Sequence, residues 1–250
     1  IYDQPFGAEA EYSTGTQKTT ALPGPLAPLG NQGLFHNGTE GTSVEVKSQS
    51  ISMLFGYQPT ENFNFYAGPV YQTIKGDVQL RGLAYGGNAT FGGYNASIKE
   101  TGDIGWLAGA AFQIPDIALK ASVTYRSEIE HSVNVKESFN SAGLLAGLNA
   151  APSLNTDITT PQSVNLDFQT GIMANTVAFA NVRWVDWSSF SIQPYKFGLA
   201  SKSAAIQAQT GKSEFDLVAY TDDQISATVG VGRKLNDQWA GNVSVGWDSG

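Results

Sequence analysis

Residues 117–135 read IALKASVTYRSEIEHSVNV and alternate between apolar and polar side chains along almost their whole length. A two-residue period places the apolar side chains on one face of a β-strand and the polar ones on the other. Strands of globular proteins usually have about 3–10 residues, whereas a tilted strand that crosses a bilayer needs about 9–11. We therefore predict one long strand here, which crosses a membrane and continues above it.

The composition excludes several classes of protein. Charged residues make up 14% of the chain, well below the roughly 25% of soluble domains, and no window reaches the 18 or so apolar residues of a membrane helix. A chain that crosses lipid in another way must form a closed β-barrel. The net charge of −8 argues against a nucleic-acid partner. Cysteine is absent, which excludes disulfides and cysteine-based sites.

Similar alternation recurs along the chain. Eight full strands and a partial ninth are expected, at residues 2–12, 43–57, 63–80, 102–114, 117–135, 162–173, 175–192, 215–234 and 238–249. Val44 and Val46 fall on the opposite parity from Ile51, which suggests a bulge between them. Pro69 lies deep within a predicted strand, where it lacks the N–H of a ladder bond, so a kink or bulge is also expected there.

The connections alternate between short turns and long loops. Short turns are expected at residues 58–62, 115–116, 174–175 and 236–237, and long loops at about residues 13–42, 81–101, 136–161 and 193–214. Transmembrane barrels sort their connections in this way, with turns on the periplasmic side and loops outside. A soluble all-β protein is the alternative, but it would need a second layer over the apolar face. Four tryptophans near strand ends fit the aromatic girdles of such barrels: Trp184, Trp187, Trp239 and Trp247. The predicted fold is therefore all-β, an antiparallel transmembrane β-barrel.

Several motifs carry a family resemblance. Val-Thr-Tyr-Arg-Ser-Glu-Ile occupies residues 123–129, and Trp-Val-Asp-Trp-Ser-Ser-Phe occupies residues 184–190. Weaker similarities lie at residues 5–8, 236–239 and 246–248. Together and in this order they resemble the FadL/TodX family (OmpP1-type) of outer-membrane transporters for hydrophobic compounds, over essentially the whole chain.

The resemblance implies a fourteen-stranded barrel with an N-terminal hatch. On this register, residues 1–250 form one partial barrel domain that lacks the hatch and the first and last strands. The implied function is passive, ligand-specific uptake of long-chain fatty acids or aromatic hydrocarbons across the outer membrane of a Gram-negative bacterium. Ligands would bind between extracellular loops and leave laterally through the barrel wall. The implied partners are such a ligand and the lipid and lipopolysaccharide of the membrane, with a monomeric full-length protein and no cofactor.

Two loops are expected to form the site where ligands enter. The loops at residues 81–101 and 136–161 are rich in Gly and apolar residues, as an apolar groove requires, although self-packing of the loop tops is the alternative. The candidate ligand-binding residues are Leu83, Tyr85, Phe91, Tyr94, Phe139, Leu144, Leu145 and Leu148. The last four are predicted to share one face of a short helix.

A carboxylate head group would need a basic partner. The fatty-acid members of the family use an Arg and a Lys. The expected counterpart of the Arg is Arg81, with Lys75 in reserve. The alternative is that Arg81 is a solvated rim residue. Thr221 stands where the Lys is expected, which leaves room for neutral hydrocarbons. Gly7 is the candidate for the lateral gate, because Gly tolerates the strained dihedrals of a kink.

Other charged residues are expected to serve the wall and not the ligand. They lie on the polar parity of predicted strands, where they would face the lumen and pair across strands: Lys120, Arg126, Glu128, Glu130, Asp167 and Arg183. His36 and His131 lack metal-ligand spacing, and no catalytic constellation occurs, so neither an enzyme nor a metal site is predicted. A general diffusion porin and a non-transporting surface protein remain the alternative functions.

Overall fold

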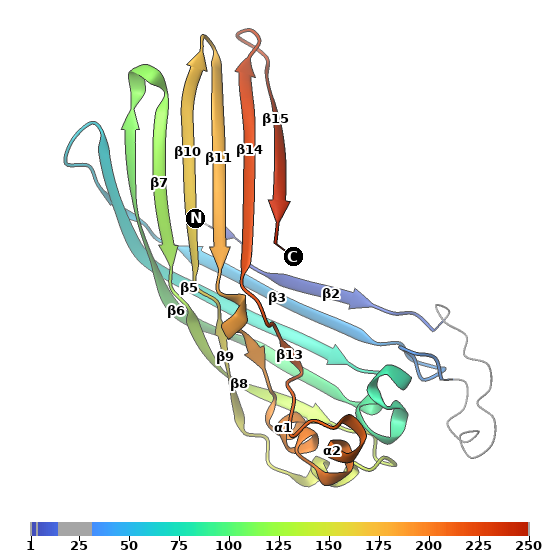
Figure 1. Cartoon of the computed structure of the whole chain (residues 1–250). Helices are drawn as coiled ribbons and strands as arrows, with labels where there is room; N and C mark the ends of the chain where they lie inside the picture. The colour runs from blue at the N-terminus through green and yellow to red at the C-terminus, as the bar shows by residue number, and fades with distance from the viewer. Residues whose placement is uncertain (1, 4, 15–31, 250) are drawn as a thin grey trace.

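The computed structural model describes residues 2–3, 5–14 and 32–249, whose strands form one large curled antiparallel sheet and a separate two-stranded sheet (Figure 1). Part of the predicted loop 13–42 therefore lies outside the described residues. The strands are β1 (Tyr2–Asp3), β2 (Gly7–Glu11), β3 (Ser43–Ser52), β4 (Phe55–Tyr57), β5 (Phe63–Gln79), β6 (Asn95–Ile114), β7 (Leu119–Arg126), β8 (Ile129–Ser138), β9 (Asn155–Thr160), β10 (Ser163–Met173), β11 (Thr176–Val185), β12 (Ser191–Ile192), β13 (Val218–Ala219), β14 (Gln224–Lys234) and β15 (Ala240–Asp248).

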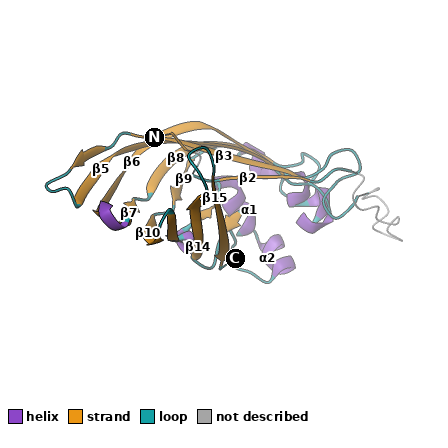
Figure 2. Cartoon of the chain, turned by 90° about the horizontal axis from the view of Figure 1, so that it is seen from above, coloured by secondary structure: helices purple, strands orange, loops and turns teal. Residues whose placement is uncertain are grey.

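The sheet follows the order β1-β3-β5-β6-β7-β10-β11-β14-β15, with β2 beside β3, β4 beside β5 and β8–β9 as an extension of β6. Within the described residues, β15 at one end and β1 with β2 at the other each pair on one side only. Seen from above, the sheet is an open arc with α1 (Tyr195–Ser201) and α2 (Ala204–Thr210) on its concave side (Figure 2). The short turns gather at one end of the strands, and the long connections and both helices gather at the other end (Figure 1).

The described residues also contain six 3-10 helices: η2 (Leu83–Tyr85), η3 (Gly87–Ala89), η4 (Phe91–Gly93), η5 (Pro115–Ile117), η6 (Ala146–Ala150) and η7 (Trp187–Ser189). Among the described residues, no helix is both long and apolar enough to cross a membrane. Each of the nine predicted strand segments contains at least one strand, so the alternation located the wall correctly.

The predicted boundaries of the loops were less accurate. β6 begins at Asn95, inside the predicted loop 81–101, and β9 lies inside the predicted loop 136–161. Conversely, most of residues 215–223 do not extend the sheet, because only Val218 and Ala219 are in a strand, and they pair with β12 in a separate two-stranded sheet.

The prediction of one strand across residues 117–135 is wrong, because the strand breaks at Ser127 and Glu128. The Trp106 N–H donates to Ser127 Oγ at 3.0 Å, so a side chain accepts a bond that a regular ladder would give to a carbonyl. β7 pairs with β6 and β10, whereas β8 pairs with β6 and β9. The break reverses the faces: Val123 is on the outer face, but Val133 is fully buried on the inner one. β6 has a matching shift in its register with β5, between the pairs Ile74–Thr101 and Gly76–Ile98.

The wall changes polarity at the level of this break. Along β5 the outer face is apolar up to Tyr71 and then carries Lys75, while the inner face carries Gln72 and then Ile74 and Val78, both buried. On the side of the short turns, called here the lower half, the outer face is apolar, as lipid requires. On the side of the long connections, called here the upper half, the outer face is polar and the inner face is apolar. The apolar core of the molecule therefore lies inside the upper half of the arc, under the long loops.

This inversion also corrects the bulge predicted between Val44 and Ile51. β3 runs without a shift against β5 from Ser43 to Ser52, and Val44 is inward-facing because the upper lumen is apolar. The kink or bulge predicted at Pro69 is not present as such, because β5 runs through Pro69 and its register with β6 does not shift there. β3 and β4 are interrupted opposite it, and the Met53 N–H donates to the Pro69 carbonyl at 3.1 Å.

Aromatic side chains mark the edge of the outer apolar band. Trp106 and Tyr125 lie with ring centroids 5.1 Å apart near the loop side of the band. Trp247 is exposed near the end of β15, and Trp239 is exposed at the opposite turn. Trp187 does not belong to a girdle, because it packs against the buried core, with its ring centroid 5.3 Å from that of Phe190.

The lumen face carries cross-strand pairs, as predicted for Asp167. Its carboxylate accepts from Asn181 Nδ2 at 2.7 Å and from Ser122 Oγ at 3.4 Å, on the two neighbouring strands. Glu130 departs from the prediction, because the break at Ser127 places it on the exposed outer face of β8.

Candidate ligand cavity beneath the long loops

An aromatic cluster joins three long connections inside the upper half of the arc. Phe91 comes from the loop after β5, Phe139 follows β8, and Phe197 and Phe215 come from the segment between β12 and β13. Ring centroids are 4.7 Å apart for Phe91 and Phe197, and 5.5 Å apart for Phe91 and Phe215. Tyr94 lies between Phe139 and Phe197, at 5.1 and 5.3 Å. These contacts fold the loops down onto the apolar inner wall.

A cavity of about 560 Å³ lies between this wall and the helices α1 and α2. Its lining comprises Val44, Val78, Leu80, Ala84, Tyr85, Gly86, Thr90, Phe91, Phe197, Ile206, Gln209, Thr210, Lys212, Phe215, Asp216, Leu217 and Val218. Most of these side chains are aliphatic or aromatic, and only Lys212 and Asp216 are charged. The volume falls within the roughly 300–1,000 Å³ of small-molecule sites, so the cavity is shaped for a mainly apolar ligand.

Some of the predicted ligand-binding residues line this cavity, some are buried beside it, and the others do neither. Tyr85 and Phe91 line it, whereas Tyr94, Phe139 and Leu145 are buried in the core next to it. Leu83 and Leu148 are half-buried and do not line it, Leu144 is 67% exposed, and Lys75 lies on the outer face of β5.

The short helix predicted to present Phe139, Leu144, Leu145 and Leu148 on one face is not present as such. Only the 3-10 helix η6 forms there, at Ala146–Ala150. The Asn149 amide instead clamps the backbone of Phe139, accepting from its N–H at 2.8 Å and donating to its carbonyl at 3.0 Å. The clamp and the two glycines of this loop, which are poor helix formers, favour a compact turn.

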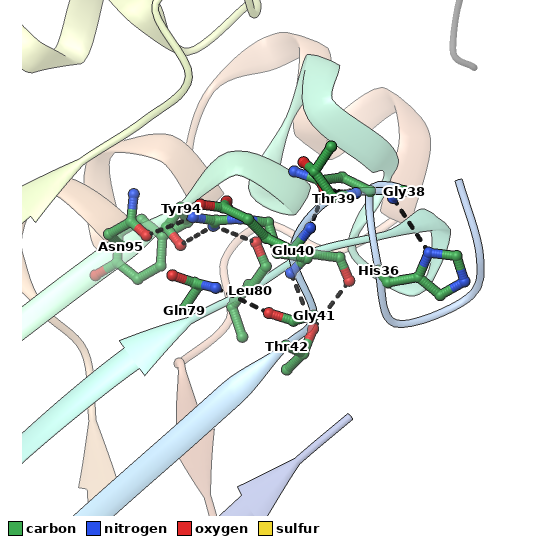
Figure 3. A network of polar contacts seen from close by, with 12 residues as sticks. His36, Gly38, Thr39, Glu40, Gly41, Thr42, Gln79, Leu80, Tyr94 and Asn95 are labelled. Atoms are coloured by element: carbon green, nitrogen blue, oxygen red, sulfur yellow. Dashed lines mark hydrogen bonds and ion pairs between the residues drawn. The ribbon is translucent and has the colours of Figure 1, made fainter. Parts of the chain in front are cut away.

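Arg81 lies in a polar network at the base of the loop after β5, and its partners Glu40, Leu80, Tyr94 and Asn95 are labelled in Figure 3. Its side chain is 7% exposed and pairs with Glu40, at 2.7 Å from Nε to Oε2. The remaining bonds run to the carbonyls of Leu80 and Tyr94, at 2.8 and 3.1 Å, and to Asn95 Oδ1 at 2.8 Å. Arg81 is not part of the cavity lining, so its guanidinium acts mainly on the protein itself.

A buried acid ties α1 to the wall. Glu137 at the end of β8 accepts from the N–H groups of Lys196 and Phe197, each at 2.8 Å, and from the Tyr94 hydroxyl, also at 2.8 Å. Burial raises the pKa of the Tyr94 hydroxyl far above its usual range, and the Glu137 carboxylate raises it further. Tyr94 therefore remains a neutral donor. Lys196 Nζ in turn donates to the Asn149 carbonyl at 3.2 Å.

Of the 17 residues that line the cavity, only Tyr85 and Phe91 were predicted as ligand-binding residues. Phe197 and Ile206 lie in the predicted long loop 193–214, to which no role was given, and Phe215 and Leu217 lie at the start of the predicted strand 215–234. Regularly spaced apolar residues such as Phe197, Ala200 and Ile206 were the available signal, because all three are buried. Two helices of seven residues each are too short for a clear periodic pattern.

The region of Gly7 contains a break in the edge strand. β1 ends at Asp3 and β2 begins at Gly7, and between them the Phe6 N–H donates to Ser48 Oγ at 3.0 Å. Gly7 is not among the residues with positive φ, so the strain expected there is absent. A Cβ on Gly7 would instead lie 3.2 Å from the Val46 carbonyl oxygen, which indicates that close approach of the strands favours glycine. Thr221 is exposed and bonds to Asp222 Oδ2 at 2.8 Å.

The comparisons with known proteins agree with this architecture. A family model described as outer membrane protein transport protein (OMPP1/FadL/TodX) matches residues 32–240. No curated protein sequence gives a significant match. Within the described residues, no group of three or more His, Asp or Glu side chains is placed to hold a metal ion.

Solved structures share the fold at low sequence identity. A Pseudomonas aeruginosa FadL homologue matches with a TM-score of 0.57 and 17% identity, over 82% of this chain and 50% of that one. The Pseudomonas putida toluene transporter TodX matches with 0.56 and 13%, over 99% and 63%. The Ralstonia pickettii toluene transporter TbuX matches with 0.56 and 12%, over 85% and 59%. The present chain thus spans between 50% and 63% of the length of these relatives.

Proposed function

Because the chain belongs to the OMPP1/FadL/TodX family of outer membrane transport proteins, we propose that the full-length protein carries out passive, ligand-specific uptake of hydrophobic molecules. The family match confirms the resemblance and the outer-membrane location predicted from the sequence, and the structural matches confirm the β-barrel fold. The observation that carries the proposal is the apolar cavity of about 560 Å³ beneath the long loops. An open lumen lined with charge, as a general porin needs, would not place aromatic residues from three connections around one space.

We propose neutral hydrocarbons as the preferred ligands. Arg81 donates to four protein acceptors, Glu40, Leu80, Tyr94 and Asn95, so a fatty-acid carboxylate would have to displace bonds that hold the loop. Lys212 is the only cation of the lining, and it is exposed and shares the lining with Asp216. A head group at Lys212 would therefore gain only a screened surface interaction. TodX and TbuX are toluene transporters, which is consistent with this choice.

We further propose that the ligand leaves through the wall at the break between β1 and β2. There the ladder between the edge strand and β3 is interrupted, and Ser48 supplies a side-chain acceptor for the Phe6 N–H. Phe6 packs on Trp187 and Phe190, with centroids 6.1 and 6.2 Å away. The apolar residues of the break thus contact the same core that surrounds the cavity.

Uptake by living cells tests this function. Cells without their own transporter receive the full-length gene and are supplied with labelled toluene, labelled oleate or a labelled sugar. Toluene accumulation well above that of the empty vector supports the proposal, and oleate accumulation at a comparable rate would revise the ligand class to fatty acids. Sugar permeation without uptake of either hydrophobic compound would identify a general porin. Accumulation of none of the three, with the protein in the outer membrane, would indicate a non-transporting surface protein.

A further inference from the structure

The segment at residues 193–217 is built as a lid over the cavity. Its two ends meet in the short β12–β13 sheet, where Ile192 pairs with Val218. Two further bonds close the base: the Leu217 N–H donates to the Ile192 carbonyl at 2.9 Å, and Gln193 Nε2 donates to the Phe215 carbonyl at 3.3 Å. Everything between these ends projects from one narrow base, a geometry that permits the segment to move as a unit.

The lid covers the cavity with its apolar side. Phe197 and Ile206 are both buried, and with Phe215 they line the side of the cavity opposite Val78 and Leu80 of the wall. A ligand in the cavity would contact the wall and the lid at the same time. Movement of the lid would therefore open one side of the cavity while leaving the wall intact.

One side chain of the wall holds the lid in place with a charge. The Glu137 carboxylate accepts from the N–H groups of Lys196 and Phe197 at the start of α1. Tyr94 donates to the same carboxylate from the loop after β5. Hydrogen bonds to an ionised acceptor are about twice as strong as neutral ones, so this contact outweighs each of the neutral bonds at the base.

We propose that Glu137 is the latch of a lid formed by residues 193–217, and that release of the latch admits ligand to the cavity. This inference rests on the proposed function for the identity of the ligand, but the movement of the lid is a separate claim. Glu137→Gln keeps the shape of the side chain, removes its charge and replaces one acceptor oxygen by a donor group. Glu130→Gln is the matched control, because Glu130 lies on the same strand but on its exposed outer face.

Spin labels measure the movement directly. Residues 1–250 contain no cysteine. Ala205→Cys on α2 and Asp77→Cys on the outer face of β5 therefore supply the only two labelling sites within these 250 residues of the full-length protein. With Glu137 present we expect one short distance between the labels. Glu137→Gln should raise the population of a longer distance roughly tenfold, and Glu130→Gln should leave the distribution unchanged. An unchanged distribution in Glu137→Gln would overturn the latch.

Binding of the neutral fluorescent probe N-phenyl-1-naphthylamine separates the two proposals. Faster association and dissociation of the probe in Glu137→Gln, in parallel with the longer distance, support both. A longer distance without probe binding by any variant supports the lid and contradicts the proposed ligand class. If Glu137→Gln fails to assemble, Tyr94→Phe removes a single donor from the latch, and it must shift the distances in the same direction for the inference to stand.

Discussion

The guanidinium of Arg81 donates to carbonyls on both sides of its loop and pairs with Glu40, so it joins residues 32–42 to the ends of β5 and β6. Removing it leaves the buried carbonyls of Leu80 and Tyr94 without these donors. Arg81→Ala should lower the free energy of unfolding by about 2–4 kcal/mol, measured by urea unfolding of the full-length protein in lipid. Lys75→Ala, on the exposed outer face, should change it by less than about 0.5 kcal/mol.

The same variant separates a structural role from ligand binding. If Arg81 acts on the protein alone, the fraction of Arg81→Ala that folds should bind N-phenyl-1-naphthylamine and oleate with the same relative preference as the parent protein. A variant of unchanged stability that selectively loses oleate binding would show that Arg81 binds the head group, as the sequence first suggested.

Lys212 offers a second test of the ligand class. It is the only cation in the cavity lining and is exposed, so its attraction for a carboxylate is weakened by water and salt. Lys212→Gln should reduce oleate affinity by no more than about fivefold and leave the neutral probe unchanged, as measured by fluorescence titration at low and high salt. A much larger and salt-resistant loss for oleate would point to a dedicated carboxylate site.

Among the structural elements, the interruption between β3 and β4 depends on a glycine in the neighbouring strand. A Cβ on Gly68 would lie 1.7 Å from the Met53 carbonyl oxygen, which belongs to the backbone and cannot swing aside. Gly68→Ala should therefore destabilise the barrel by at least about 1–3 kcal/mol, observed as unfolding at lower urea concentration. Gly241→Ala is the control, because its Cβ would meet nothing within 4 Å. Equal effects of the two substitutions would refute the steric explanation.

The connection between η7 and β14 depends on an ionised Asp223. The bonds from Ser188 lower the pKa of this carboxyl below its usual value, and the bond from Trp184 Nε1 lowers it further. The pKa is lower in the folded state, so this stabilisation is complete above the ordinary Asp pKa of about 3.9 and is lost as the pH falls through the lowered value.

This linkage predicts a change in tryptophan environment at acidic pH. Because Trp184 donates to Asp223 at 3.0 Å, its fluorescence should shift as the pH is lowered below about 3.9. Asp223→Asn should show the shifted signal already at neutral pH and lose the pH dependence. A transition of equal size in Asp223→Asn would assign the titration to another group.

The elements also show where sequence periodicity stops being informative. Apolar residues keep odd numbers from Val123 to Val133, yet the break at Ser127 sends them to opposite faces. The sequence alone predicts one uninterrupted strand, because the apolar residues keep the same parity before and after the break. Only the pairing with β6, which shifts at the same level, reveals the reversal. The positions of the strands were therefore predictable from the sequence, whereas the face of the sheet on which each side chain lies was not.

For the whole molecule, the same limit applies to the site. Composition identified the loop after β5, and Tyr85 and Phe91 do line the cavity. The other half of the lining comes from residues 197–218, brought there by the Glu137 contact and by aromatic packing across long sequence separations. Tertiary contacts of this kind leave no local period. The chain spans between 50% and 63% of the length of its structural relatives.

The inverted polarity of the wall leads to a prediction for the full-length protein in its membrane. Val229 lies midway along β14 on the outer face, within the apolar band, whereas Gln49 lies on the outer face of β3 above that band. Val229→Arg places a charge in lipid and should cost about 2–4 kcal/mol, visible as reduced heat-resistant barrel in the outer membrane and a lower free energy of unfolding in lipid. Gln49→Arg should cost about 0–1 kcal/mol, since the side chain remains in water. Equal penalties at the two positions would place both residues in the same environment, and the change of polarity at the break in the wall would then not mark the membrane boundary.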